Sequence, residues 1–290
     1  MKNLLIRSIT GILFVAVMVS GICLRGDAMI LLFALITGLS LWEYTGLVNE
    51  VKDVTVNRFI STAAGIYLFL AIAGFCADMV PSSAFIPYLL TVIYLFISEL
   101  YTGNKNAIND WAYTMLGQMY IALPLSSINV LAFQQSPEQG GVVYNWVLPM
   151  SVFVFLWLND TGAYCTGSLL GRHKLFPRIS PGKSWEGSIG GAVLVLIVSA
   201  LVPYLSSFSV ETEALTSRLS QVEWIGLGLI VVFFGTWGDL VESLFKRTLG
   251  IKDSGNILPG HGGMLDRFDS SLMAIPAAVV YLYTLAMLVE

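Results

Sequence analysis

The chain has 290 residues, of which 56% are hydrophobic and only 12% are charged, whereas a soluble domain carries about 25% charged residues. This composition excludes an ordinary soluble domain and indicates a protein that crosses a membrane several times. The net charge is only −4 and the sequence contains no basic arm, so we expect no nucleic acid as a partner.

Apolar runs long enough to cross a bilayer as helices, about 20 residues each, recur along the whole chain. We predict an all-α, polytopic helical bundle of about nine transmembrane helices, at residues 4–24, 28–48, 58–77, 82–100, 110–133, 144–170, 186–208, 222–248 and 268–289. The first run resembles a signal peptide, but no small-x-small cleavage site closes it, so we expect a retained helix. The joints are too short to hold a separate soluble domain.

The basic residues predict the orientation of these spans. With the N-terminus in the cytoplasm, thirteen of the fifteen Lys and Arg residues fall on the inner side, and only Arg25 and Arg218 fall outside. The basic loops at 171–185 and 246–267 then both face the cytoplasm. We divide the chain into N-terminal transmembrane helices (1–140) and a C-terminal transmembrane region (141–290), which holds most of the polar residues within spans.

The densest polar stretch runs from Gly238 to Ser270. Asp239, Glu242, Ser243 and Lys246 share one face of a helix because they are spaced i, i+3, i+4 and i+7. A carboxylate at the bilayer centre costs about 2.5–3.5 kcal/mol, so Asp239 is expected to be paired, solvated or bound to a metal. The alternative is an interfacial charge cluster that only anchors the end of the helix.

This polar stretch continues into an irregular loop. A polar turn at residues 252–255 precedes residues 259–263, where three glycines and a proline surround His261. Such a backbone exposes N–H groups that can bind phosphate oxygens, although a lone histidine here is more often a turn residue. Asp266 and Asp269 follow at i, i+3, and hard oxygen ligands without cysteine favour Mg²⁺ over zinc.

Two upstream segments also contain polar residues within or directly beside apolar spans, where folding of the helix does not require them. Asp160, Tyr164 and Gly167 are spaced i, i+4 and i+7 in the sixth span and predict a face that lines a polar cavity. A packing seam of small residues is the alternative, and it explains Gly167 but not Asp160. The segment 180–187 places Lys183 and two serines directly before a helix, which suits an anion site. Its alternative is a basic cytoplasmic loop capped by Ser184.

The run from Ser243 to Asp269 resembles the signature of the phosphatidate cytidylyltransferases, also called CDP-diacylglycerol synthases. It reads S-x-F-K-R-x4-K-D-S-G-x2-L-P-x-H-G-G-x2-D-R-x-D. The segment 180–187 and the Asp160/Tyr164 face are similar to that family as well. The resemblance therefore covers about the C-terminal half of the chain.

The resemblance implies a membrane enzyme of phospholipid synthesis that joins CTP and phosphatidic acid to give CDP-diacylglycerol and pyrophosphate. It also implies a requirement for Mg²⁺, a second, monovalent cation, and a homodimer. Asp239 and Asp266 match the metal-binding acids of the family. The attacking group is the phosphate of the lipid, so no serine or cysteine nucleophile is needed. We expect an integral protein of the cell (inner) membrane with its active site facing the cytoplasm.

The candidate site residues follow from these patterns and from the resemblance. The candidate catalytic residues are Asp239, Lys252, Asp253 and Asp266. The candidate substrate-binding residues are Asp160, Tyr164, Ser180, Lys183, Ser243, Lys246, Arg247, His261, Gly262, Gly263, Arg267 and Asp269.

A rival hypothesis from another functional class is an ion-coupled membrane transporter, with the intramembrane residues Asp160 and Asp239 on an ion path. Such transporters carry inverted repeats with interrupted helices near the midplane. Here the polar residues cluster on one side and no repeat is visible. An enzyme that transfers phospho-alcohols from CDP-lipids ranks lower still, because its DG-x2-AR motif is absent.

Overall fold

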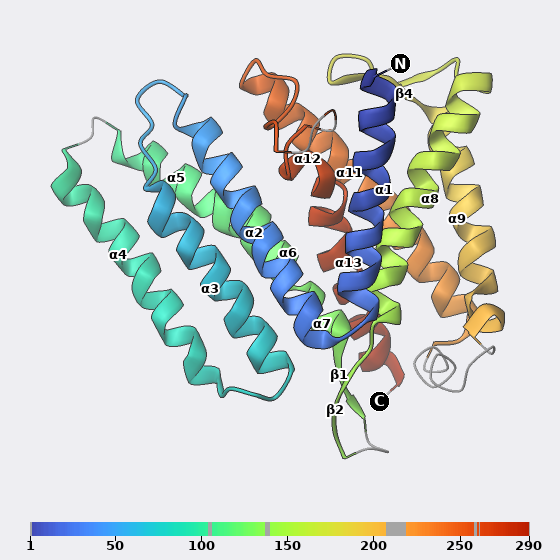
Figure 1. Cartoon of the computed structure of the whole chain (residues 1–290), viewed down its shortest axis with the longest axis horizontal. Coiled ribbons are helices and arrows are strands. Elements are labelled where there is room, and N and C mark those ends of the chain that lie inside the picture. The colour runs from blue at the N-terminus through green and yellow to red at the C-terminus, as the bar shows by residue number, and fades with distance from the viewer. Residues whose placement is uncertain are drawn as a thin grey trace. The chain divides into compact units, whose positions relative to one another are not determined.

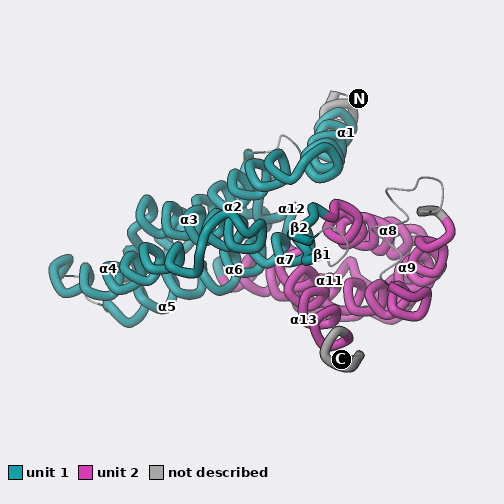
Figure 2. The backbone as a smooth tube through the Cα atoms, turned by 90° about the horizontal axis from the view of Figure 1, so that it is seen from below, with its two compact units in different colours: residues 1–144, 249–268 teal, residues 145–248, 269–290 magenta. Residues whose placement is uncertain are grey.

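The computed structural model describes residues 2–103, 106–136, 140–206, 219–257, 260 and 262–289, which form helices and two short β-hairpins (Figure 1). The chain divides into two compact units (Figure 2). Unit 1 comprises Met1–Tyr144 and Leu249–Phe268, and unit 2 comprises Asn145–Thr248 and Asp269–Glu290. The polar stretch is thus shared between the units.

Unit 1 is built from the N-terminal helices and the segment that follows residue 248. Its elements are α1 (Lys2–Cys23), α2 (Gly26–Val48), α3 (Arg58–Cys76), a 3₁₀ turn (Ser82–Phe85), α4 (Ile86–Thr102), α5 (Ala107–Gly117), a π-helical turn (Gln118–Ala122), α6 (Leu123–Ser126), α7 (Ile128–Ala132), the antiparallel hairpin of β1 (Phe133–Ser136) and β2 (Gly141–Tyr144), and α12 (Leu265–Phe268). The hydrophobic core of unit 1 is centred on α2, where Phe33, Leu41 and Tyr44 are fully buried.

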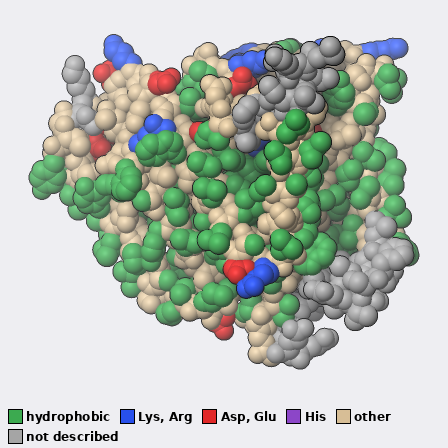
Figure 3. All heavy atoms as spheres, viewed as in Figure 1, with side chains coloured by type: hydrophobic (Ala, Val, Ile, Leu, Met, Phe, Trp, Pro, Cys, Tyr) green, Lys and Arg blue, Asp and Glu red, His purple; other side chains and the backbone are tan. Residues whose placement is uncertain are grey.

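Helix α4 differs from the other long helices of unit 1 because Leu95 is its only buried residue. Its exposed large apolar side chains include Leu89, Leu90, Ile93 and Leu100, and hydrophobic side chains are frequent on the face of the molecule seen in Figure 3. An exposed apolar surface of this kind is costly in water but favourable against lipid tails. Helix α4 therefore has the surface of a lipid-facing membrane helix.

The described residues of unit 2 form four long helices and one hairpin. Its elements are α8 (Val147–Leu170), the antiparallel hairpin of β3 (Lys174–Phe176) and β4 (Ser180–Ser184), α9 (Trp185–Ser206), α11 (Gln221–Thr248) and α13 (Ser271–Val289). Helices α8 and α9 pack along a seam of glycines, since a Cβ atom on Gly162 would lie 2.9 Å from the Cα atom of Gly191. The predicted seam of small residues is therefore present, and it allows the two backbones to approach closely.

The helical class is confirmed, whereas the count of about nine spans is not. Among the described residues, seven helical segments are long and apolar enough to cross a membrane: Gly26–Val48, Arg58–Cys76, Ser82–Thr102, Ala107–Ala132, Trp185–Tyr204, Gln221–Thr248 and Leu265–Leu285. Ser8–Cys23 is a shorter apolar helix. The predicted sixth span forms α8 but is absent from the seven, and polar residues such as Asn159 and Asp160 interrupt its apolar run. This helix begins at Val147 because residues 141–144 pair as β2.

The glycine seam makes a prediction about stability. Gly162→Ala should lower the free energy of unfolding by about 1–3 kcal/mol, because the added methyl group meets the backbone of α9, which cannot move aside cheaply. Gly141→Ala is the matched control, since no atom lies within 4 Å of its Cβ position, and its effect should stay within about 0.5 kcal/mol. Thermal unfolding of the purified protein in detergent measures both, and equal effects would contradict the seam.

Candidate functional site

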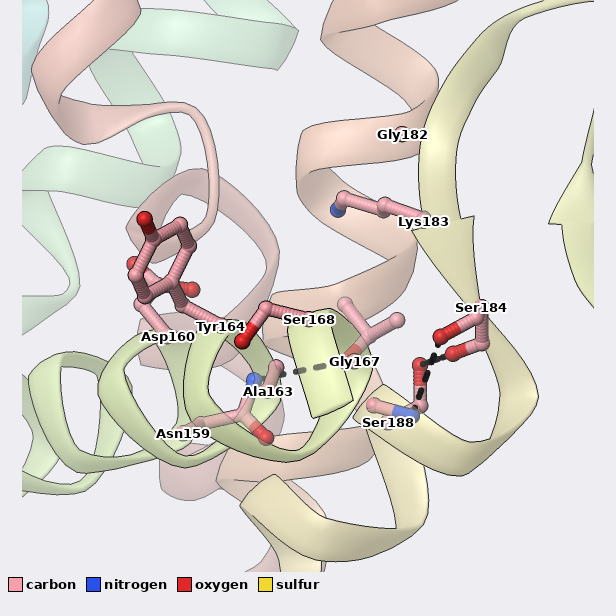
Figure 4. Close-up of a pocket in the computed structure, with 12 residues that line it drawn as sticks. Asn159, Asp160, Ala163, Tyr164, Gly167, Ser168, Gly182, Lys183, Ser184 and Ser188 are labelled. Carbon is pink, nitrogen blue, oxygen red and sulfur yellow. Dashed lines mark hydrogen bonds between the residues drawn. The ribbon is translucent and has the colours of Figure 1, made fainter. Parts of the chain in front are cut away.

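A polar pocket of about 350 Å³ lies within unit 2, between α8, β4 and the first turn of α9 (Figure 4). Its lining includes Asp160, Tyr164, Ser168, Lys183 and Ser188. The pocket thus offers a carboxyl group, an ammonium group and several hydroxyl groups within one concavity. A lining of this kind suits a polar ligand with an anionic part, and its volume lies in the range of small-molecule sites.

Helix α8 supplies one wall of this pocket. Asp160, Tyr164 and Gly167 all line it, as their spacing of i, i+4 and i+7 predicts. Asn159 is buried beside them, and its side-chain amide donates to Thr236 Oγ1 of α11 at 3.5 Å. Gly167 also packs against α9, since its Cβ position lies 3.5 Å from the Cα atom of Gly187. The polar face and the small-residue seam therefore coexist on α8.

The β3–β4 hairpin supplies Lys183, and the start of α9 holds this hairpin in place. The Glu186 carboxylate accepts the backbone N–H groups of Arg172 and His173 and contacts His173 Nδ1 at 2.6 Å. The Ser184 hydroxyl accepts the N–H of Gly187 at 3.1 Å, which confirms the predicted helix cap. The segment before α9 is thus a strand rather than an open turn.

Lys183 pairs with Asp239 of α11 within unit 2. The Nζ atom of Lys183 lies 2.5 Å from Asp239 Oδ2, and both side chains are 26% exposed. The Ser243 hydroxyl donates to Asp239 Oδ1 at 3.2 Å, so Asp239 and Ser243 share one helix face as predicted. Two neighbours therefore hold the Asp239 carboxylate, one on each oxygen.

The neighbouring acid on α11 is also paired. Glu242 is fully buried, and its Oε2 atom lies 2.6 Å from Lys246 Nζ, one helical turn later. A buried carboxylate needs such a partner because water no longer solvates it. Lys246 therefore neutralises a carboxylate of its own helix, whereas Arg247 is exposed at the end of α11.

Asp269 adds a third carboxyl group to the surroundings of Lys183. It is half-buried, its Oδ1 atom accepts the N–H of Ser270 at 2.5 Å, and it interacts electrostatically with Asp239, Asp160 and Lys183. Gly238 permits this arrangement, because a Cβ atom there would lie 2.8 Å from the carbonyl oxygen of Asp269. Of the three carboxyl groups, Asp239 forms the ion pair with Lys183, and neighbouring carboxylates repel one another unless a positive charge offsets them.

Asp266 lies in unit 1 and organises the loop before it. It is buried, and its Oδ2 atom accepts the N–H groups of Ser254 and Gly263, both at 2.8 Å. Gly262 has a φ of +82°, and a Cβ atom on it would lie 2.5 Å from the same Oδ2 atom. At least two N–H groups of the glycine-rich stretch are therefore directed at a carboxylate of the same stretch.

Sequence reasoning assigned no role to Glu43 of α2, which contacts this same loop. Its Oε2 atom accepts the N–H of Leu265 at 2.9 Å and the hydroxyl of Ser254 at 3.3 Å, and Glu43 is only 8% exposed. All of these residues belong to unit 1. An acid in the interior of an apolar helix is a sequence pattern that could have indicated a role for Glu43. The sequence does not indicate its partner, however, which lies more than 200 residues away.

The remaining candidates are placed as follows. Lys252, Asp253 and Arg267 are exposed in unit 1, and His261 lies outside the described residues. Ser180 begins β4, opposite Phe176 in the register of the hairpin. The described part of the chain contains no group of three or more His, Cys, Asp or Glu side chains arranged to hold a metal ion. A cation shared by Asp239 of unit 2 and Asp266 of unit 1 stays a prediction.

Comparisons with known proteins match almost the whole chain. The sequence model of the cytidylyltransferase family matches residues 5–285. A phosphatidate cytidylyltransferase of Staphylococcus aureus (strain COL) is 35% identical over 273 residues, which cover 93% of this chain and 96% of the relative. The enzyme of that name from Staphylococcus haemolyticus is 33% identical over 272 residues, with the same coverage of both chains. The likeness therefore extends well beyond the C-terminal half.

The contacts of Glu186 make a prediction about the loop that leads to Lys183. In Glu186→Ala, the amide hydrogens of Arg172 and His173 should exchange about tenfold faster, because each loses a charge-assisted hydrogen bond. Hydrogen exchange followed by mass spectrometry measures this change. Glu223→Ala is the control, since that carboxylate accepts the N–H of Ser220 instead. Unchanged exchange at residues 172–173 in Glu186→Ala would contradict the assigned contacts.

Proposed function

The chain belongs to the cytidylyltransferase family, and from this premise we propose that it transfers the cytidylyl group of CTP to phosphatidic acid. The products are CDP-diacylglycerol, a precursor for phospholipid synthesis, and pyrophosphate. The observation that carries the proposal is the match to enzymes named phosphatidate cytidylyltransferase over 93% of this chain. Seven helices of membrane-spanning length and apolarity suit an enzyme whose substrate is a lipid. The relatives give no support to a transporter.

The reaction joins two anionic reactants. A phosphate oxygen of phosphatidic acid forms a bond to the α-phosphorus of CTP, while the bond from that phosphorus to the bridging oxygen of the β-phosphate breaks. The electron pair of the broken bond leaves with pyrophosphate. The enzyme therefore has to align two phosphate groups and offset their repulsion, and it needs no nucleophile of its own.

The pocket of unit 2 fits the task of holding a phosphate-bearing substrate. Lys183 supplies a positive charge, and Asp239 holds this ammonium group before any substrate arrives. Side chains that are held in place by a partner lose less freedom when a ligand binds. The carboxyl and hydroxyl groups of Asp160, Tyr164 and Ser168 line the same pocket and would bind polar groups of the substrate.

The exposed basic residues Arg247, Lys252 and Arg267 complete the proposed phosphate-binding set. Each is exposed within its own unit, so each side chain is accessible to a ligand from solvent. Lys246 differs, because its ammonium group already neutralises the buried Glu242. We therefore assign Lys246 to the support of α11, in addition to the phosphate contact that the sequence suggests.

Mg²⁺ belongs to the proposal, with Asp239 and Asp266 as its protein ligands. The electrostatic interaction of Asp269 with the carboxyl groups of Asp239 and Asp160 supports a nearby positive charge, and carboxylate oxygens are the ligands that Mg²⁺ prefers. When bound, this ion neutralises phosphate charge as it develops. Asp253 and Asp269 would orient water or basic side chains nearby. A second, monovalent cation and a homodimer are further parts of the proposal.

The proposed location is the cell (inner) membrane, with the N-terminus and the active site on the cytoplasmic side. The distribution of basic residues supports it, since thirteen of fifteen fall on one side of the predicted topology. CTP would reach the site from the cytoplasm, and phosphatidic acid would reach it from the bilayer.

The first test is release of pyrophosphate. Purified protein given CTP, phosphatidic acid and Mg²⁺ should release pyrophosphate only when both substrates are present. Asp239→Asn should lower kcat by about 10²-fold or more, because the amide lacks the negative charge that holds Lys183 and that would hold the cation opposite the phosphates. Asp266→Asn should be similarly impaired.

Asp27→Asn is the matched control for these variants, since Asp27 forms an exposed ion pair with Arg25 at the start of α2. It should keep the rate of the unmodified protein. If well-folded protein released no pyrophosphate with several lipid phosphates, the proposed reaction would be wrong.

A second test addresses orientation. In a variant without Cys23, Cys76 and Cys165, a single cysteine replaces either Arg25 or Asn256, both of which are exposed. A membrane-impermeant thiol reagent applied to intact cells should label Arg25→Cys, whereas Asn256→Cys should react only after the cells are opened. The reverse pattern would place the active site on the outer side.

A further inference from the structure

A network of hydrogen bonds links Glu43 of α2 to both ends of the glycine-rich loop in unit 1. One oxygen of Glu43, Oε2, accepts the hydroxyl of Ser254 and the N–H of Leu265. The N–H of Ser254 in turn donates to Asp266 Oδ2, which also accepts the N–H of Gly263. The segment 254–265 is therefore closed at both ends by two carboxylates.

The sequence of the loop is adapted to this carboxylate. A Cβ atom on Gly255 would lie 2.5 Å from Glu43 Oε1, and one on Gly263 would lie 2.5 Å from Glu43 Oε2. Neither glycine has a positive φ, so backbone conformation does not explain them. Both lie where a side chain would displace the Glu43 carboxylate, so they let the loop close around it.

The stability of unit 1 alone does not account for a carboxylate here. Glu43 is 8% exposed, and its Oε1 atom has no hydrogen-bond partner among the described residues. A buried polar atom without a partner costs free energy, and an apolar side chain of similar size avoids this cost. Glu43 is costly to bury, but it binds the loop at Ser254 and at Leu265. It is therefore suited to fixing the position of that loop.

We propose that Glu43 is a positioning residue, which holds Ser254 and Leu265 so that the adjacent acids Asp253 and Asp266 keep one arrangement. Each contact lies directly beside one of these candidate catalytic residues, since Ser254 follows Asp253 and Leu265 precedes Asp266. The inference rests on the roles proposed above for the two acids. It adds a residue of α2, from the N-terminal half of the chain, to the support of the active site.

The experiment compares Glu43→Ala, Glu43→Asp and Glu43→Gln with the unmodified protein. Hydrogen exchange without substrates or Mg²⁺ should become about tenfold faster at Leu265 and Ser254 in Glu43→Ala, because the network opens. Glu43→Asp should behave like Glu43→Ala, since it keeps the charge but is one methylene too short. Glu43→Gln keeps the length and one acceptor oxygen, so it should retain most of the protection.

Activity gives the second measurement. In Glu43→Ala, kcat should fall by about 10–10²-fold because small displacements of catalytic groups are costly, and the Mg²⁺ concentration for half-maximal rate should rise. The KM for phosphatidic acid should change less than about twofold. Glu50→Gln is the control, since Glu50 lies exposed in the turn after α2, and it should change none of these quantities.

A double-mutant cycle tests whether the glycine and the carboxylate act together. Gly255→Ala alone should raise exchange at Leu265 as Glu43→Ala does, because its methyl group displaces the carboxylate. The double variant Glu43→Ala/Gly255→Ala should be no worse than Glu43→Ala, since the space is then open. Additive effects would overturn the inference.

The outcomes separate this inference from the proposed function. Unchanged exchange at residues 254 and 265 in Glu43→Ala would overturn the positioning role, whatever the activity. A lower melting temperature with unchanged kcat and unchanged Mg²⁺ dependence would reduce Glu43 to a structural residue and overturn it as well. Faster exchange in a protein whose unmodified form releases no pyrophosphate would contradict the proposed reaction, and with it the role of Glu43 in that reaction.

Discussion

The structure depends on one constraint: a carboxylate within an apolar chain needs a partner from the protein, because burial removes part or all of its hydration. Asp239 and Glu242 are satisfied by Lys183 and Lys246, whereas Asp266 and Glu43 accept backbone N–H groups. Lys246 lies on the same helix as Glu242, whereas the partners of Asp239, Asp266 and Glu43 come from other segments that have to fold toward the acid. The acids therefore determine where the β3–β4 hairpin and the glycine-rich loop lie within their units.

Glycine makes these approaches sterically feasible, and it does so in two ways. Between α8 and α9, the seam around Gly162 brings two backbones together and sets the wall of the pocket beside Asp160. In the loop of unit 1, Gly255 and Gly263 leave room for a side chain, the carboxylate of Glu43. Gly255 and Gly263 of the family signature therefore make room for a carboxylate within the loop. This role is separate from any contact with phosphate.

Local spacing was enough to predict the helical faces, because residues on one helix obey a fixed period. The face of Asp160 and Tyr164, the pairing of Asp239 with Ser243 and the cap at Ser184 all follow from that rule. The same spacing does not predict contacts between segments that are far apart in the sequence. The contact of Glu43 with Leu265 spans more than 200 residues, and the β3–β4 hairpin depends on ties to α9. The count of about nine spans is not confirmed, and α8 is absent from the seven candidate spans of the described residues because polar, pocket-lining residues interrupt its apolar run.

The ion pair of Lys183 and Asp239 also bears on how substrate and cation would bind. The two side chains neutralise each other at 2.5 Å, so neither charge is uncompensated before a ligand arrives. If Lys183 turns to a phosphate of CTP, Asp239 loses its counter-charge, and a half-buried carboxylate without a partner is unfavourable. The proposed cation at Asp239 would offset that loss, and the phosphate would offset the charge of Lys183. Under the proposed roles, nucleotide and cation would therefore favour each other's binding, because Lys183 would bind the nucleotide while Asp239 would bind the cation.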